Sequence, residues 1–218
     1  MLRQPPGTWS GDVELLVAAA ENRRRLLGVY WLPSRGILAA VFRDPVDRWG
    51  LFERISEEEL RHAYRMECPR GCGYCCALRS GAFVLETELR YLPRWARRIV
   101  ERQPSRVVET RMGPVRVYML GTGPLGSCVF FNPRTATCRL EEEAGREAKP
   151  IVCRLTYCTL FATGPRGRLL RLPGSKTPKY RPATRREWEE AVKAMRERWL
   201  SEWRRRGLPR GPPGSRGV

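Results

Sequence analysis

The sequence lacks the groups on which several enzyme classes depend. Its 218 residues include a single histidine, His62, and no serine–histidine–aspartate arrangement is evident around it. It also contains neither a P-loop nor the glycine fingerprint of a dinucleotide-binding turn. These absences argue against a serine-type hydrolase, a P-loop nucleotidase and a nicotinamide-dependent dehydrogenase, and we identify no catalytic residue from the sequence.

Long apolar segments are missing as well. No run of about 18 apolar residues occurs, so the sequence predicts no helix that spans a bilayer. A secretory signal has a basic start followed by an apolar stretch, and the N-terminus, MLRQPPGTWSGD, does not show this pattern. We therefore expect a cytoplasmic protein.

Lysine is scarce, although the chain is strongly basic. Of the 41 basic residues only four are lysines, and the formal net charge is +18. Such a charge attracts polyanions, for example RNA, DNA or an anionic membrane surface. The arginine triplets at 23–25 and 204–206 are either phosphate contacts or solvated helix ends. Because a GC-rich genome also favours arginine, a nucleic-acid partner and a merely basic surface both remain open.

Cysteine, by contrast, is abundant. The chain has eight cysteines, and four of them fall in the nine residues CPRGCGYCC (68–76). In a chain without a secretory signal, clustered cysteines indicate metal ligands, because cytosolic thiols are normally kept reduced. Disulfides are the alternative, since they are common in the cytosol of hyperthermophiles. The candidate metal ligands are Cys68, Cys72, Cys75, Cys76, Cys128, Cys138, Cys153 and Cys158.

Thiolate ligands favour zinc or an iron–sulfur cluster over magnesium, calcium or manganese. Eight cysteines would make two closed zinc sites of four thiolates each. A four-iron cluster also takes four thiolates, here Cys72, Cys75 and Cys76 with one later cysteine. The paired C-x2-C knuckles of a zinc ribbon are absent, which favours iron and, with it, electron transfer to a redox partner protein. His62, on a charged helix, is expected to be a surface or packing residue and not a ligand.

Within the cluster, Gly71 and Gly73 permit the sharp turns that the spacing requires. The adjacent Cys75 and Cys76 project in different directions in most backbone conformations. One of them would therefore bind a first centre, while the other reaches a second metal or bridges the two.

Three separated motifs resemble the YkgJ-type cysteine-cluster family, which is described as a zinc- or iron-chelating domain. They are CPRGCGYCC, CVFFNPRTATCRL from Cys128, and KPIVCRL from Lys149. The family shows a C-x(2–4)-C-G-x-C-C opening, a C-x-F/L segment with a second cysteine after a short turn, and an R/K-P-x-x-C-R signature. The resemblance covers roughly residues 66–160. It implies that seven of the cysteines are ligands, whereas Cys158 is additional to the family pattern.

Members of this family are commonly described as iron–sulfur proteins. We expect Lys149 and Arg154, which fall in its last motif, to be cations that offset the negative charge of the thiolates. A distant relative, the flagellin lysine methylase, has a similar cysteine cluster. The present chain looks shorter than that enzyme and lacks a glycine-rich methyl-donor motif, so methyl transfer is the least favoured function.

The apolar pattern predicts an α+β fold, with a small N-terminal helix and an antiparallel meander, an irregular metal-organised domain and a long C-terminal helix. In the N-terminal region, residues 1–64, a helix is predicted at 11–26 from the helical spacing of its apolar residues. Three apolar runs separated by turn residues predict the meander. The segment 56–66, with Ser56 and Glu59 in capping-box register, predicts a second helix. The three runs are residues 26–32, 36–42 and 49–55.

The cysteine-cluster domain, residues 65–180, is expected to be irregular because a metal replaces part of the hydrophobic core. Residues 86–103 are predicted to be helical, with an interruption or a start at Pro93. Two hairpins are predicted, at 106–120 with a turn at Gly113-Pro114 and at 160–172 with a turn at Gly164 to Gly167.

The clearest predicted helix lies within residues 181–206, where Thr184 and Glu187 form a capping box. One face carries an aromatic stripe, which we expect to pack on the chain's own core; binding of a partner is the alternative. A disordered basic tail is predicted for residues 207–218. The stripe consists of Trp188, Ala191, Val192, Met195, Trp199 and Trp203.

Overall fold

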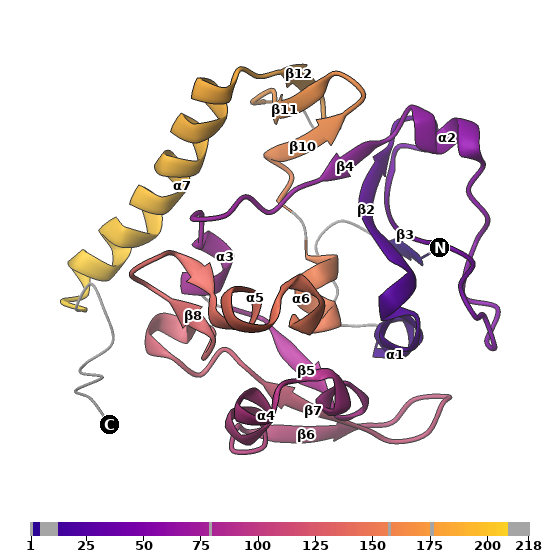
Figure 1. The fold of residues 1–218 in the computed structure, drawn as a ribbon, viewed down its shortest axis with the longest axis vertical. Helices are drawn as coiled ribbons and strands as arrows, with labels where there is room; N and C mark the ends of the chain where they lie inside the picture. The colour runs from indigo at the N-terminus through magenta and orange to yellow at the C-terminus, as the bar shows by residue number, and fades with distance from the viewer. Residues whose placement is uncertain (1, 5–12, 79, 157, 175–176, 209–218) are drawn as a thin grey trace.

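The structure is a computed structural model that describes residues 2–4, 13–78, 80–156, 158–174 and 177–208. It confirms the α+β class, with antiparallel sheets, short helices and one long C-terminal helix. Three short helices, α3 (Tyr74–Ala77), α5 (Arg139–Ala144) and α6 (Ile151–Leu155), lie at the centre of Figure 1, between a large sheet and a smaller one. No helix among the described residues is long and apolar enough to cross a membrane.

The large sheet has the strand order β1-β3-β2-β4-β10-β11-β12, and every adjacent pair is antiparallel. It joins strands from both sides of the boundary expected after residue 64, because β4 pairs with β2 on one side and β10 on the other. Its strands are β1 (Leu2–Gln4), β2 (Leu26–Leu32), β3 (Ile37–Phe42), β4 (Tyr64–Met66), β10 (Phe161–Gly164), β11 (Gly167–Arg171) and β12 (Tyr180–Pro182).

Of the three strands predicted for the meander, the structure confirms the first two. β2 and β3 pair as expected, but the third run, 49–55, is not a strand. The carboxylate of Asp47 accepts hydrogen bonds from the backbone N–H groups of Leu51 and Phe52, at 2.8 and 2.9 Å. Those N–H groups are therefore satisfied by a turn and not by a strand ladder. The ring of Phe52 still reaches the core, where it meets Phe42 edge to face.

The two N-terminal helices are shorter than predicted. α1 (Val13–Glu21) is followed by a 3-10 turn, η2 (Arg23–Arg25), while residues 11 and 12 lie outside the described part of the chain. α2 (Glu57–Arg61) begins with the expected capping box but ends at His62. Residues 64–66 form β4 because their pairing with β2 extends the large sheet.

The smaller sheet has the order β5-β7-β6, and its β6–β7 hairpin confirms the predicted turn near Gly113. The β10–β11 hairpin is also as predicted, with Gly164 opposite Gly167. Pro93 separates a 3-10 segment, η3 (Glu86–Tyr91), from α4 (Arg94–Val100). The strands are β5 (Phe83–Leu85), β6 (Ser105–Val108) and β7 (Val115–Met119).

A further hairpin of two very short strands, β8 (Phe131–Asn132) and β9 (Thr137–Cys138), was not predicted. Its strands are too short to give a periodic signal. It leads directly into α5; Cys138 is its last residue, and Cys128 lies three residues before its first strand.

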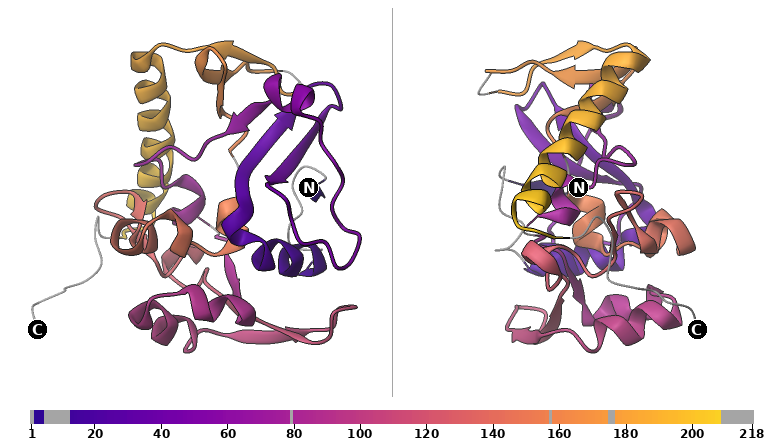
Figure 2. Two further views of the ribbon diagram at one scale, coloured as in Figure 1. Left: turned by 45° about the vertical axis from the view of Figure 1, so that its right-hand side comes forward. Right: turned by 90° about the vertical axis from the view of Figure 1, so that its left-hand side faces the viewer.

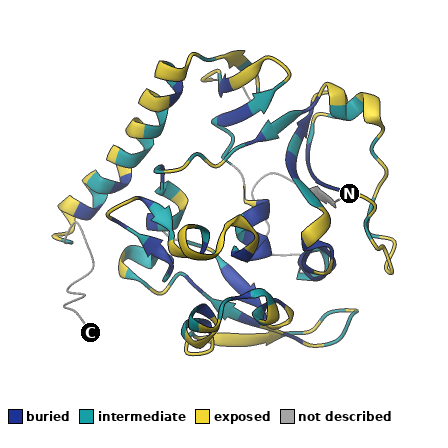
Figure 3. Cartoon of the chain, in the orientation of Figure 1, coloured by how far each residue is buried: buried dark blue, intermediate teal, exposed yellow. Residues whose placement is uncertain are grey.

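The last helix, α7 (Arg185–Arg205), confirms both its predicted capping box and its docking on the chain's own core. Figures 1 and 2 show it running along one edge of the molecule, and Figure 3 shows its outward face as largely exposed. Trp199 is fully buried, and Trp188 and Trp203 are also buried. The tail that was predicted to be disordered begins at 207, and residues 209–218 lie outside the described part.

Candidate metal centre

The first four cysteines sit on a turn and a short helix between β4 and β5. Both glycines of the segment have positive φ, 78° at Gly71 and 62° at Gly73, as the tight spacing predicted. Gly73 is the N-cap of α3. A Cβ there would lie 2.8 Å from the Phe131 ring and 3.0 Å from the Ala136 carbonyl oxygen. The glycine therefore lets the β8–β9 hairpin pack directly against the cysteine segment.

α7 holds the same segment from the other side. The indole Nε1 of Trp199 donates a hydrogen bond of 2.9 Å to the carbonyl oxygen of Cys72. The indole of Trp203 donates one of 3.2 Å to the carbonyl of Ala77. The aromatic stripe thus fixes the backbone at both ends of the Cys72–Ala77 segment.

The thiols fall into two sets of four, which we name by their exposure. The outer set contains two exposed residues, Cys68 and Cys75, whereas no residue of the inner set is exposed. The outer set is Cys68, Cys72, Cys75 and Cys158; the inner set is Cys76, Cys128, Cys138 and Cys153.

Backbone pairing brings Cys158 to the outer set. β4 and β10 are antiparallel, with Met66 opposite Ala162, and the Glu67 N–H donates to the carbonyl of the residue before Ala162. The Phe161 N–H in turn donates to the carbonyl of Cys158, so the turn that carries Cys158 directly precedes the residue that pairs with Glu67. Burial raises the pKa of Cys72 to about 11, and the charges of Cys68 and Cys158 add to the increase.

The other members of the outer set face one another in the same way. Although part of the Cys75 residue is exposed, burial of its thiol raises the pKa to about 12, and the other three thiols of the set contribute to the shift. Burial also raises the pKa of Cys158, and Cys68 is the thiol that adds to it. Each of the four thiols therefore interacts with the other three.

The inner set is assembled from three elements. The N–H of Cys128 donates a 2.9 Å hydrogen bond to the carbonyl of Cys76, and Cys138 follows from the β8–β9 hairpin. Burial raises the pKa of Cys128 to about 12. It raises the pKa values of Cys76 and Cys153 well above the ordinary thiol value.

The electrostatic contacts again link all four members. Cys128 and Cys138 add to the pKa shift of Cys76, and these three thiols together add to that of Cys153. One electrostatic interaction between thiols connects the two sets: the charge of Cys68 adds to the pKa shift of Cys76. The adjacent Cys75 and Cys76 accordingly belong to different sets, as their divergent directions predicted.

Lys149 lies between the two sets. It lines a small cavity of about 20 Å³ together with Cys68 of the outer set and Cys153 of the inner set. Its Nζ pairs with Glu141 at 3.0 Å. Although burial acts to lower the pKa of Lys149, the charges of Cys68 and Glu141 raise it above the ordinary lysine value. The expected cation beside the thiols is therefore present.

Arg154 lines the same small cavity as Lys149, Cys68 and Cys153, and its guanidinium also bonds to other elements. Its guanidinium donates a 2.8 Å hydrogen bond to the carbonyl of Arg23 and pairs with Glu147 at 2.8 Å. Arg23 in turn pairs at 3.3 Å with Glu88, which is fully buried and also accepts from the N–H of Ile151 at 2.7 Å. This polar network ties η2, η3 and α6 together, and α6 carries Cys153.

The donor set fits a thiophilic metal. Four thiolates per set match tetrahedral zinc or one four-iron cluster. Within the described residues all eight thiols are free, and no three His, Cys, Asp or Glu side chains are already close enough to hold a metal ion. Metal binding at these thiols would release their protons. His62 is exposed at the C-cap of α2, as expected for a surface residue.

The sequence pointed to the eight cysteines as candidate ligands and to Lys149 as a cation beside them. It did not show how the cysteines divide into two sets. It also missed Glu88 and Glu141, since an acidic residue in a helical stretch gives no sign of burial or of its partner. Comparison with family models, with curated proteins and with solved structures returned no match for this chain.

Proposed function

We propose that this protein binds metal through its eight cysteines, in two centres of four thiolates each. The observation that supports the proposal is the division of the thiols into two mutually facing sets, which Cys75 and Cys76 separate at adjacent positions. A purely structural use of the thiols as small apolar residues would not need four of them around each of two points.

The metal is iron–sulfur or zinc. An iron–sulfur protein would carry electrons to a redox partner protein, and the more exposed outer set is the side from which a partner would approach. Zinc would instead stabilise a region whose sheets are small. A reducing compartment such as the cytoplasm, which we propose as the location, keeps such thiols available for metal.

The experiment is anaerobic purification followed by an absorption spectrum and analysis for iron, zinc and acid-labile sulfide. A brown protein with a band near roughly 400 nm and matched iron and sulfide identifies clusters. A colourless protein with about two zinc ions per chain identifies two structural sites. Protein that holds no metal, and that has almost no free thiol without reductant, would show that the cysteines form disulfides and would refute the proposal.

A second candidate function rests on the net charge of +18. In it, zinc is structural and the arginine-rich surface binds RNA or DNA. Such binding weakens steeply as salt rises, because counterions are released from the phosphates. A binding measurement at about 50 and 200 mM salt tests it: we expect a fall of several orders of magnitude if many phosphates are contacted, and no binding at either concentration removes this candidate.

A further inference from the structure

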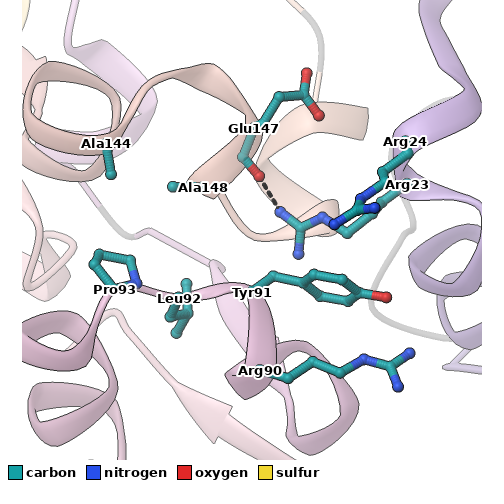
Figure 4. Close-up of a pocket in the computed structure, with 9 residues that line it drawn as sticks. All are labelled: Arg23, Arg24, Arg90, Tyr91, Leu92, Pro93, Ala144, Glu147 and Ala148. Carbon is teal, nitrogen blue, oxygen red and sulfur yellow. Dashed lines mark hydrogen bonds between the residues drawn. The ribbon is translucent and has the colours of Figure 1, made fainter.

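A cationic cavity of about 690 Å³ opens beside Arg23 (Figure 4). η2 and η3 supply its polar wall, and its other side comes from the end of α5 and from the following 3-10 turn, η5 (Arg146–Ala148). Its volume is within the range of pockets that hold small ligands. It is lined by Arg23, Arg24, Arg90, Tyr91, Leu92, Pro93, Ala144, Glu147 and Ala148.

Three arginines line this cavity, and the guanidinium of one of them already bonds to other groups of the protein. Arg23 is buried and bonds to Glu88 and to the carbonyls of Glu147 and Lys149. Arg24 and Arg90 are exposed, and in the part of the chain that the structure describes neither has a carboxylate partner. Two guanidinium groups are thus free to bind an anion.

An aromatic ring positions the arginines. The guanidinium of Arg23 lies 4.5 Å from the centroid of the Tyr91 ring, and that of Arg90 lies 4.8 Å from it. Figure 4 shows the ring between the two side chains. Because cation–π contacts hold a guanidinium in place without using its N–H groups, Arg90 keeps its donors for a ligand.

The one carboxylate on the wall does not cancel this charge. In Figure 4 the carboxylate of Glu147 points away from Tyr91 and Arg90, and it pairs with Arg154 at 2.8 Å. The opposite wall is apolar and consists of Leu92, Pro93, Ala144 and Ala148. The cavity therefore offers cationic donors on one side and an uncharged surface on the other.

We propose that this cavity binds a small phosphorylated ligand with an uncharged ring, of the size of a nucleoside monophosphate. Arginine forks match the oxygens of a phosphate and bind them through paired hydrogen bonds. The ring of the ligand would lie against Pro93 and Ala144. The proposal goes beyond metal binding and does not depend on it, since no cysteine lines the cavity.

Calorimetric titration of the purified, metal-loaded protein with AMP, adenosine and inorganic phosphate tests the proposal. We expect AMP to bind at least about tenfold more tightly than adenosine, which lacks the charge, and than phosphate, which lacks the ring. The double variant Arg24→Ala/Arg90→Ala should bind AMP at least about tenfold more weakly than the wild type. Ala144→Trp, which fills the cavity and keeps every charge, should lose AMP to a similar extent.

The control is Arg102→Ala/Arg106→Ala, which removes two exposed arginines that do not line the cavity. It should bind AMP as the wild type does. Equal losses in both double variants would mean that AMP responds only to net charge, and would overturn the proposal. Equal affinities for AMP and adenosine, or unchanged AMP binding in Ala144→Trp, would overturn it as well.

Discussion

At the scale of single residues, the two glycines of the cysteine segment differ in the space around them. Gly71 and Gly73 both have positive φ, which costs any other residue backbone strain. At Gly71 a Cβ would meet no atom within 4 Å, whereas at Gly73 it would meet Phe131 at 2.8 Å and Ala136 at 3.0 Å. Only Gly73 is required by packing.

We therefore expect Gly73→Ala to destabilise the protein more than Gly71→Ala does, by about 1–3 kcal/mol in the free energy of unfolding. The two variants share the strain of positive φ, so their difference isolates the clash with the β8–β9 hairpin. Urea unfolding followed by circular dichroism measures it. Equal stabilities would mean that the hairpin does not rest on Gly73.

Glu88 is a second residue with a testable property. Burial raises its pKa to about 7, although the Ile151 N–H and the Arg23 charge act to lower it. Between about pH 4.5 and 7 the folded protein therefore holds a proton that the unfolded chain has released. The contribution of Glu88 to stability is complete below that range and is lost as the pH rises through it.

Glu88→Gln removes this titration, so the stability of the wild type should fall more steeply than that of the variant between about pH 4.5 and 7. A lost hydrogen bond in the variant adds a constant offset but no slope. Urea unfolding at several pH values gives both profiles, with Glu189→Gln, at an exposed residue, as the control. Parallel profiles for wild type and Glu88→Gln would contradict the assignment.

At the scale of elements, α7 acts as a brace for the cysteine segment. Trp199 is fully buried and its indole N–H satisfies the carbonyl of Cys72. Trp49, by contrast, is 48 % exposed in a loop. The same substitution at the two positions separates the brace from the general effect of losing an indole.

Trp199→Phe should destabilise the protein by about 1–3 kcal/mol, because a buried carbonyl loses its donor. It should also speed the loss of metal to a chelator, since the backbone of Cys72 is less firmly held. Trp49→Phe should change neither quantity. If Trp199→Phe releases metal at the wild-type rate, α7 does not support the centre.

Elements with a strong local signal could be predicted, and those defined by distant partners could not. The α7 capping box and stripe, and the glycine turns of two hairpins, lie within short windows of sequence. The strand predicted at 49–55 was wrong because Asp47 accepts hydrogen bonds from the N–H groups of Leu51 and Phe52, which the apolar pattern does not reveal. β4 was assigned to a helix because its pairing with β10 spans almost a hundred residues.

The same limit applies to the candidate site. Spacing alone made each cysteine a ligand candidate and set Cys75 and Cys76 apart. Membership of a set depends on tertiary contacts, for example on the pairing of β4 with β10, which places the turn at Cys158 next to the start of the cysteine segment. The motif pointed to Lys149 and Arg154, which both line the cavity beside Cys68 and Cys153, but it did not reveal that Arg154 also bonds to the Arg23 carbonyl and to Glu147.

At the scale of the whole molecule, the short helices α3, α5 and α6 lie among the two larger sheets and α7 (Figure 1). The thiols lie where these parts meet. The outer set comes from the segment after β4, from α3 and from the segment before β10, and the inner set comes from α3, from the β8–β9 hairpin and the segment before it, and from α6. Metal binding at the two sets would therefore fasten the parts to one another. This is the central claim of the account.

The measurement that tests it most directly is the metal content per chain of Cys75→Ser, Cys138→Ser and the double variant, each compared with the wild type after anaerobic purification. Each of these cysteines faces only its own set, and serine is nearly the same size. We expect each single variant to keep about half of the wild-type metal and the double variant to keep almost none. Loss of all metal from either single variant would indicate one shared centre, and full metal in both would show that the thiol sets are not the ligands.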